Sequence, residues 1–205
     1  MLRYLTSGES HGQSLISIID GLPSNVELNF DEINAELKKR QCGYGRGGRM
    51  KIESDKVNIL GGVRGKKTLG GPVSIEVKNR DYQNWTEYMA PMDDVDFETR
   101  KVDNVRPGHA DLVGCLKYDF TDARNVLERS SARETASRVA VGAICKQVLK
   151  NFDIDFVSHV IQIGNVKDEN VYDFDYIKNN VDSSEVRCAN KDMEAKMISQ
   201  IDEIK

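Results

Sequence analysis

The apolar residues of this chain follow two different spacings, and each spacing predicts a different kind of element. Residues 14–22 are a run of β-branched and aliphatic side chains that ends in a Gly-Leu-Pro turn, and residues 73–77 alternate between apolar and polar positions. Both patterns are typical of strands. Residues 191–204 instead carry apolar side chains at helical spacing, which predicts a helix. The chain therefore mixes strands with helices.

A second helix is predicted from Asn29 through Lys39. Asn29 lies three residues before Glu32, which is the spacing of a capping box that satisfies the first N–H groups of a helix. Three apolar residues recur at helical spacing after this cap and predict the buried stripe: Phe30, Ile33 and Leu37.

The longest helical pattern covers Leu127–Lys150. Ser131 stands three residues before Glu134, again the spacing of a capping box. The N–H groups of a helix start favour an anion, and Arg129 and Arg133 flank this one. Small residues also recur along one face of the helix: Ala132, Ala136, Ala140 and Ala143. A buried, alanine-rich helix with solvated arginines at its start explains the same pattern, so the helix alone does not decide between the two interpretations.

Shorter signals predict the remaining elements. Residues 50–53 and 57–60 are typical of the two strands of a hairpin, and residues 79–104 of a long loop. Residues 112–121 are typical of a short helix, and residues 156–166 of a strand. Strand patterns outnumber helical ones, and hairpin spacings are more evident than β-α-β spacings. We therefore predict an α+β fold in which antiparallel sheets pack on buried helices.

Composition narrows the class of protein. Of the 205 residues, 39% are hydrophobic and 30% are charged, which fits a soluble globular protein rather than a disordered or membrane protein. No apolar run reaches the length of a transmembrane helix, and the first residues lack the apolar region of a signal peptide. The four cysteines form no C-x-x-C pair. We therefore expect a reduced, cytoplasmic protein without a zinc site or a disulfide framework.

The net charge of −4 is unevenly distributed along the chain. Residues 153–205 hold 12 acidic and 6 basic side chains, whereas residues 38–51 hold six basic side chains and no acidic one. A local basic cluster in an acidic protein favours a small anionic ligand over a long polyanion. We therefore expect no nucleic-acid and no membrane partner.

Two histidines lie in glycine-containing turns and are candidates for proton transfer. His11 stands in the motif G-E-S-H-G, and His109 in R-P-G-H, two residues before Asp111, which can orient the imidazole. Taken alone, G-E-S-H-G is more simply explained as a turn histidine with one hydrogen bond. Its letters also fit a nucleophile elbow, but no strand precedes it and no helix follows, so we reject that interpretation. His159 lies in a predicted strand and is interpreted as structural.

The glycine-rich segment at residues 43–49 carries Arg46 and Arg49. It lacks the G-K-[ST] ending of a Walker loop, and it follows a predicted helix, unlike a Rossmann fingerprint. An RGG-like nucleic-acid segment is an alternative, although this one is single. We favour a loop whose arginines bind phosphate or carboxylate through paired hydrogen bonds.

These features together suit an anionic substrate bound with an anionic cofactor, and a leaving phosphate that needs positive charge and a proton. Four segments that carry them, in this order, resemble the chorismate synthase family. They are G-E-S-H-G, R-Q-C-G-Y-G-R-G-G-R-M, R-P-G-H-A-D and R-S-S-A-R-E-T-A-S-R-V-A-V-G-A, at residues 8–12, 40–50, 106–111 and 129–143. The resemblance covers nearly the whole chain, and the four motifs together are far more specific than any one of them.

The resemblance implies a single domain over residues 1–205, with a β-α-β sandwich of antiparallel sheets packed on central helices, in a homotetramer. It implies the anti-1,4-elimination of phosphate from 5-enolpyruvylshikimate 3-phosphate to give chorismate, in the shikimate pathway to the aromatic amino acids. That reaction consumes no net electrons but requires reduced FMN, with NADPH as one source of the reduced flavin.

The resemblance also assigns roles to residues of this chain. The proton-handling pair is His11 and His109. The residues that would hold substrate carboxylates and phosphate are Ser10, Arg46, Arg49, Arg106 and Arg133. Those that would contribute to the FMN site are Arg129, Ser130 and Ser131. Those that match positions associated with NADP are Arg40 and Arg46.

Members of the resembled family are longer than this chain, and their other half carries further flavin contacts and a catalytic Asp. We therefore expect a truncated amino-terminal half, and the helix predicted at residues 191–204 has no Gly, Asn or Pro stop signal after it. Two other hypotheses stay open. One is an inactive fragment that acts only as a folding or assembly unit. The other is a nucleic-acid-binding module that uses residues 38–51, which predicts salt-dependent RNA affinity.

Overall fold

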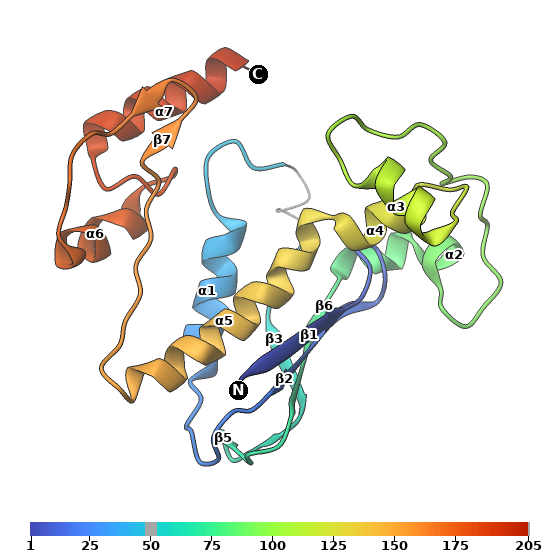
Figure 1. The fold of residues 1–205 in the computed structure, drawn as a ribbon, viewed down its shortest axis with the longest axis horizontal. Coiled ribbons are helices and arrows are strands. Elements are labelled where there is room, and N and C mark those ends of the chain that lie inside the picture. Colours follow the sequence, from blue (N-terminus) through green and yellow to red (C-terminus); the bar gives the residue numbers. More distant parts are fainter. Residues whose placement is uncertain (48–52, 205) are drawn as a thin grey trace.

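A computed structural model describes residues 1–47 and 53–204 of the chain. Its main sheet is antiparallel and has four strands in the order β1-β2-β6-β3 (Figure 1). The strands are β1 (Arg3–Ser7), β2 (Ser14–Asp20), β6 (Val73–Lys78) and β3 (Val57–Gly61). Side chains alternate across this sheet, so β2 and β6 bury one face of apolar residues: Leu15, Ile19, Val73, Ile75 and Val77.

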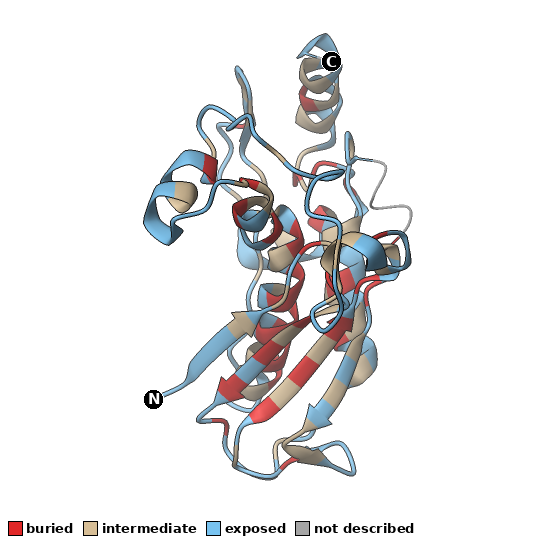
Figure 2. Cartoon of the chain, turned by 90° about the vertical axis from the view of Figure 1, so that its right-hand side faces the viewer, coloured by how far each residue is buried: buried red, intermediate tan, exposed pale blue. Residues whose placement is uncertain are grey.

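Two helices cover that face of the sheet: α1 (Phe30–Gln41) and α5 (Thr135–Lys150). Buried residues are concentrated between the helices and the sheet (Figure 2). The small-residue face of α5 lies in this core, with Ala136 and Ala140 fully buried. Small side chains let the helix approach its neighbours closely, and the predicted packing of an alanine-rich helix on a sheet is confirmed.

The start of α1 confirms the Asn29 cap but not the full capping box, because the Asn29 N–H donates to Gln147 instead of Glu32. The side chain of Asn29 accepts hydrogen bonds from the backbone N–H groups of Asp31 and Glu32, and Ile33 and Leu37 are buried as the stripe predicts. The Gln147 side chain of α5 bonds both backbone groups of Asn29, at 2.9 and 2.8 Å. The beginning of α1 is thereby attached to the end of α5.

The prediction of one helix over Leu127–Lys150 is wrong. The chain forms α4 (Arg124–Ser130), leaves helical geometry at Ser131 (ψ 146°), and restarts as the short 3-10 turn η3 (Ala132–Glu134) before α5. The Ser131 hydroxyl accepts from the N–H of Arg133, but the Glu134 carboxylate binds Thr6 and Arg138 instead of the cap amide. The capping box is therefore only half formed, because tertiary partners hold the glutamate.

Residues 79–104, predicted to be a long loop, contain short helical turns, and a further helix follows them. The turns are η2 (Arg80–Asn84) and α2 (Thr86–Met89), and the helix that follows, α3 (Asp111–Tyr118), agrees with the predicted short helix. The backbone N–H groups of Trp85 and Met89 bond carbonyls three and four residues back. Short turns of this kind have no apolar period of their own, which is why the sequence pattern did not predict them.

The hairpin predicted from residues 50–53 and 57–60 falls partly outside the described residues, because residues 50–52 are not described. In the described part, β3 confirms a strand at residues 57–60 and pairs with β6, in the register Val57↔Val77 and Ile59↔Ile75. The pairing of this strand with residues 50–53 stays a prediction. A separate two-stranded ribbon, β4 (Val63–Arg64) with β5 (Lys67–Thr68), extends from this sheet.

The last 50 residues form a second apolar cluster around Val186, Cys188 and Met197. The strand predicted at residues 156–166 is reduced to a hairpin of β7 (Gln162–Ile163) and β8 (Val166–Lys167). It is followed by α6 (Phe174–Asn180), η4 (Val181–Ser183) and α7 (Lys191–Ile204), of which α7 has its predicted bounds. The fold is thus α+β with antiparallel sheets packed against helices, as predicted. None of the helices in the described residues is long and apolar enough to cross a membrane.

Candidate functional site

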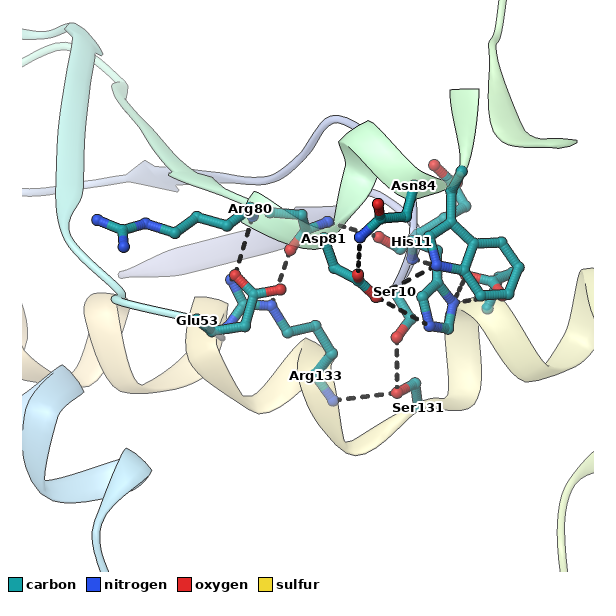
Figure 3. A network of polar contacts seen from close by, with 12 residues as sticks. Ser10, His11, Glu53, Arg80, Asp81, Asn84, Ser131 and Arg133 are labelled. Atoms are coloured by element: carbon teal, nitrogen blue, oxygen red, sulfur yellow. Dashed lines mark hydrogen bonds and ion pairs between the residues drawn. The ribbon is translucent and has the colours of Figure 1, made fainter. Parts of the chain in front are cut away.

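Three segments that are far apart in the sequence meet at one end of the main sheet (Figure 3). They are the turn between β1 and β2, the stretch from the end of β6 into η2, and the junction of α4 with η3. The turn needs Gly8, because its φ is +101° and an added Cβ would lie 2.3 Å from a backbone oxygen. The Ser10 hydroxyl donates to the Ser131 hydroxyl at 3.0 Å, and the Asn79 side chain donates to the Gly12 carbonyl at 2.8 Å.

Within this site, His11 is held by Glu128 of α4. Ring atom Nδ1 lies 2.8 and 3.0 Å from the two carboxylate oxygens, and the backbone N–H of His11 donates to the same group at 2.8 Å. Glu128 is buried, with 3% of its surface exposed. Burial raises the pKa of Glu128, but the hydrogen bonds from His11 outweigh it and leave the pKa lowered. The carboxylate is therefore ionised near neutral pH and acts as an acceptor.

An aromatic and a second carboxylate complete the surroundings of His11. The imidazole stacks on Trp85, with ring centroids 3.9 Å apart and an angle of 26° between the planes. Ring atom Nε2 lies 4.0 Å from Asp81, which also accepts from the Trp85 indole N–H at 3.2 Å. The guanidinium of Arg100 covers the indole, 4.6 Å from its centroid. The histidine is thus held at its edge and on its face (Figure 3).

Arg133, a predicted substrate-binding residue, is buried in a network next to this histidine. Its guanidinium donates to Asp55 at 2.6 Å, to the Asn79 side chain at 2.8 Å and to the Lys78 carbonyl at 3.1 Å. Glu53 lies 3.7 Å away. Because Asn79 also bonds the turn at Gly12, Arg133 connects the sheet edge, the His11 turn and the start of α5. In this structure Arg133 therefore positions other parts of the site.

Arg40, predicted to contact NADP, joins the same network from α1. It donates to the Thr135 hydroxyl and the Ala132 carbonyl, both at 2.8 Å, and pairs with Asp55 at 3.3 Å. Its side chain is only 8% exposed. Two guanidinium groups therefore share the fully buried carboxylate of Asp55, and both arginines are oriented by it.

Arg106 and His109 form a second cluster, built around Asp111 at the start of α3. Arg106 donates to the carboxylate through its backbone N–H at 2.9 Å and through its Nε at 3.0 Å, and His109 contacts it through Nδ1. Asp111 is fully buried, and the hydrogen bond from the Arg106 side chain is the largest influence that holds its pKa well below the usual range. The predicted orienting role of Asp111 agrees with this geometry.

The three residues assigned to FMN can be tested for their fit to a phosphate group. Arg129 is 43% exposed and uses one nitrogen on the Thr6 backbone and hydroxyl, so its guanidinium keeps other N–H donors. The Ser131 hydroxyl accepts from Ser10 and from the Arg133 N–H and retains its own proton to donate. Both fit an anion. Ser130 does not fit this role, because its hydroxyl donates to the Val126 carbonyl at 2.7 Å.

The described part of the glycine-rich segment, residues 43–47, lies beside the second apolar cluster through Tyr44. Tyr44 anchors it, since its N–H donates to the Glu185 carbonyl at 2.9 Å and its hydroxyl to Asp202 at 2.6 Å. Arg46 is exposed and donates to the Cys42 carbonyl at 3.2 Å. Arg49 lies outside the described residues. The contacts of Arg46 leave it available for an anionic ligand, as expected of a substrate or NADP contact.

A hollow of about 420 Å³ lies between the end of α1 and η4, away from His11. Its charged lining is already paired, because Asp182 lies 2.6 Å from Lys39 and 2.8 Å from Arg187. No predicted site residue is among its described lining residues. Within the described ranges, no group of three His, Cys, Asp or Glu side chains is arranged to hold a metal ion.

The structure brings Ser10, His11, Ser131 and Arg133 together, and it places Arg106 and His109 in the second cluster. Sequence reasoning missed the residues that hold the first cluster: Glu128, Asp81, Trp85, Asn79 and Asp55. The tryptophan, unique in the sequence, was the one visible signal within the predicted loop. The carboxylates carried no signal, because their partners are more than 50 residues away in most cases.

The comparisons with known proteins agree on one family. The family described as "Chorismate synthase" matches residues 2–205. The chain is 55% identical to a chorismate synthase of Alkaliphilus metalliredigens over 98% of its own length and 53% of the relative, and 51% identical to one of Staphylococcus epidermidis over 100% and 54%. A solved structure described as "Crystal Structure of Chorismate Synthase" superposes with a TM-score of 0.74 at 38% identity, over 99% of this chain and 53% of that one. The chain spans about half the length of the relatives that it matches.

Proposed function

Since the chain belongs to the chorismate synthase family, we propose that it forms the amino-terminal half of an enzyme that eliminates phosphate from 5-enolpyruvylshikimate 3-phosphate. In that reaction the C–O bond to phosphate and a ring C–H bond break, and a new double bond gives chorismate. The chemistry needs positive charge at the departing phosphate and groups that move protons. The enzyme is accordingly a carbon–oxygen lyase.

One observation carries this proposal: each of two histidines has ring atom Nδ1 against a buried carboxylate. His11 is held by Glu128 and His109 by Asp111. An imidazole oriented at one nitrogen exchanges protons through the other, which is the arrangement that proton transfer requires. One ring transfers a proton beside the departing phosphate, and the other does so beside the flavin.

Arginines supply the positive charge for the substrate. Arg106 lies next to His109, with Nη2 3.0 Å from the ring, and its side chain is 54% exposed. Arg46 and Arg49 would hold further anionic groups of the substrate, and Ser10 would add a hydroxyl donor. Arg133 contributes by positioning, because its guanidinium is buried against Asp55.

We assign the phosphate of FMN to Arg129 and Ser131, whose remaining donors fit it. Bound reduced FMN supplies electron density to the reacting ring and is not consumed overall. NADPH as the reductant, with Arg46 as its contact, belongs to the same proposal. We also propose a homotetramer and a cytoplasmic location. We further propose a sandwich fold, in which the rest of a full-length protein supplies a second sheet that packs on the central helices.

The proposal is tested by turnover. The chain extended to the length of its relatives should form chorismate from 5-enolpyruvylshikimate 3-phosphate only with reduced FMN. His11→Ala should lower the rate about 10²- to 10⁴-fold. His159→Ala is the matched control, because His159 lies beside Tyr172, outside both histidine clusters, and should leave the rate unchanged. Full activity of the His11 variant would refute the proton role.

Binding separates this proposal from its alternatives. Absorbance and fluorescence titration with FMN and substrate, on this chain and on the extended one, distinguishes an active half-site from a folding or assembly unit. A nucleic-acid module is not favoured, because Lys39 and Arg40 of the basic segment already pair with Asp182 and Asp55. The absence of RNA binding at low salt would exclude the nucleic-acid-binding function.

A further inference from the structure

The contact between Glu128 and His11 has more than one attachment point. The two carboxylate oxygens lie 2.8 and 3.0 Å from Nδ1, and one of them also accepts the backbone N–H of His11 at 2.8 Å. In the same turn, the Ser10 N–H donates to the Glu128 carbonyl at 2.9 Å. The side chain and the backbone of Glu128 therefore both bind the turn that carries the histidine, from 117 residues away.

The remaining contacts set the plane of the imidazole. Trp85 stacks on one face at 3.9 Å, and its indole N–H is bonded to Asp81. Asp81 is in turn bonded by the Asn84 side chain at 2.9 Å. With its edge on Glu128 and its face on Trp85, the ring cannot exchange its two nitrogens by flipping without breaking the Glu128 contact (Figure 3).

We propose that Glu128 is a positioning residue that keeps the proton of the neutral His11 ring on Nδ1 and so makes Nε2 the atom that takes up and releases protons. An ionised carboxylate only accepts hydrogen bonds, so the nitrogen within hydrogen-bonding distance of it must carry hydrogen. Nδ1 is at that distance from Glu128, at 2.8 Å, whereas Nε2 is 4.0 Å from Asp81, beyond hydrogen-bonding distance. The lowered pKa of Glu128 agrees with an ionised group. That the exchanged proton belongs to the elimination rests on the proposed function, whereas the position of the proton on the ring does not.

Glu128→Gln gives a sharp test, because glutamine has one acceptor oxygen where glutamate has two. The backbone N–H of His11, at 2.8 Å, binds that oxygen in preference to the Arg124 guanidinium, which is 3.4 Å from the carboxylate. The amide NH₂ then faces Nδ1 and donates to it, which moves the proton of the neutral ring to Nε2. Glu134→Gln is the matched control: it lies six residues away in the same region, but its carboxylate binds Thr6 and Arg138.

The measurement is the ¹⁵N chemical shift of the two ring nitrogens of His11 in this chain, with the ring neutral. We expect an Nδ1–H ring in the parent and in Glu134→Gln, and an Nε2–H ring in Glu128→Gln. An Nε2–H ring in the parent would overturn the proposal even if the Glu128 variant failed to fold. An unchanged Nδ1–H ring in a folded Glu128→Gln would overturn it as well.

The steady-state kinetics of the extended chain provide a second measurement. Glu128→Gln should lower kcat about 10- to 100-fold with little change in the KM for substrate, because binding groups stay in place while the exchanging nitrogen does not. A drop in both variants alike would mean that the effect is structural and would count against the proposal. Should His11→Ala retain activity, the proposed function of His11 fails, while the tautomer result stands by itself.

Discussion

The two histidine clusters both orient an imidazole against a carboxylate, but their residues come from different distances along the chain. His109 and Asp111 are two residues apart, and Arg106 closes the cluster from three residues before the histidine. His11 and Glu128 are 117 residues apart, and Trp85 comes from a third segment. Both imidazoles present Nδ1 to a carboxylate. The local cluster is assembled by a turn, whereas the distant one exists only if the sheet edge, η2 and the α4–η3 junction are all in place.

This difference predicts where substitutions lower the free energy of unfolding most. The His109 ring and the Arg106 guanidinium are partly exposed, so water competes for their contacts and each contributes little to stability. Behind His11, Arg133 and Arg40 share the buried carboxylate of Asp55, and Arg133 makes the shorter of the two ion pairs, so its loss removes most of the compensation for a buried charge. Substitutions should therefore be tolerated around His109 and damaging behind His11.

The largest effect is expected at Arg133. Arg133→Met should lower the free energy of unfolding by about 3–5 kcal/mol, because it leaves the buried carboxylate of Asp55 with the longer Arg40 pair alone and removes the Arg133 donor from the Asn79 side-chain oxygen. Urea unfolding followed by circular dichroism measures it. Arg129→Met, four residues earlier and exposed, serves as the control and should cost less than about 1 kcal/mol. Equal losses in the two variants would remove the contrast between the regions.

A smaller loss is expected for the carboxylate of the local cluster. Asp111→Asn should lower the free energy of unfolding by about 2 kcal/mol at neutral pH, since asparagine cannot accept from both Arg106 and His109. The same urea experiment measures it. A loss as large as that of Arg133→Met would show that the exposed cluster is as integral to the fold as the buried one.

The stabilisation that the Asp111 carboxylate contributes should depend on pH. Its pKa is lowered in the folded chain, so the unfolded chain binds more protons, and the stabilisation is complete above the ordinary carboxyl range near about pH 4. It is lost as pH falls towards the lowered pKa. The difference in unfolding free energy between the parent and Asp111→Asn should therefore shrink from about pH 6, where the carboxyl is ionised in both states, to about pH 3, below its ordinary pKa. A difference that does not vary with pH would contradict the ionised pair.

Removing the aromatic face of His11 should cost less. Trp85→Leu loses the stack on the imidazole and the contact with Arg100, and we expect a loss of about 1 kcal/mol in addition to the smaller buried area. Tyr118→Leu replaces an exposed aromatic of α3 and should stay within about 0.5 kcal/mol of the parent. Identical values for the two would mean that Trp85 does not brace the histidine.

The smallest effect is expected for Arg106→Lys. The backbone N–H of residue 106 still donates to Asp111, and the lost side-chain contacts involve a group that is 54% exposed. The loss of unfolding free energy should be smaller than for any of the preceding variants apart from their controls, because water competes for these contacts. Arg40→Lys is a useful comparison, because that guanidinium is 8% exposed and binds three groups, and the loss should be larger.

Local patterns predicted a good part of the fold. The Asn29 cap, the α7 bounds and the strands at residues 14–22 and 73–77 follow from periodicity and capping, which depend on neighbours within a few residues. The resemblance assigns Ser10, His11 and Arg133 to one site, and the structure brings Ser10 and Arg133 together at Ser131. The predicted capping box at Ser131 is incomplete because the Glu134 carboxylate binds Thr6, 128 residues away, and Arg138 on the next turn of the helix.

By itself the sequence determined the family, the α+β class, the starts of α1 and α7, and the cluster of Arg106, His109 and Asp111, because each depends on the order of residues over a short stretch. Only the tertiary structure decided which carboxylate holds His11, that Arg40 and Arg133 face inward, and that the long helix breaks at Ser131. The physical reason is that burial and charge pairing act between whichever groups the packed core brings within about 3 Å, whatever their separation along the chain.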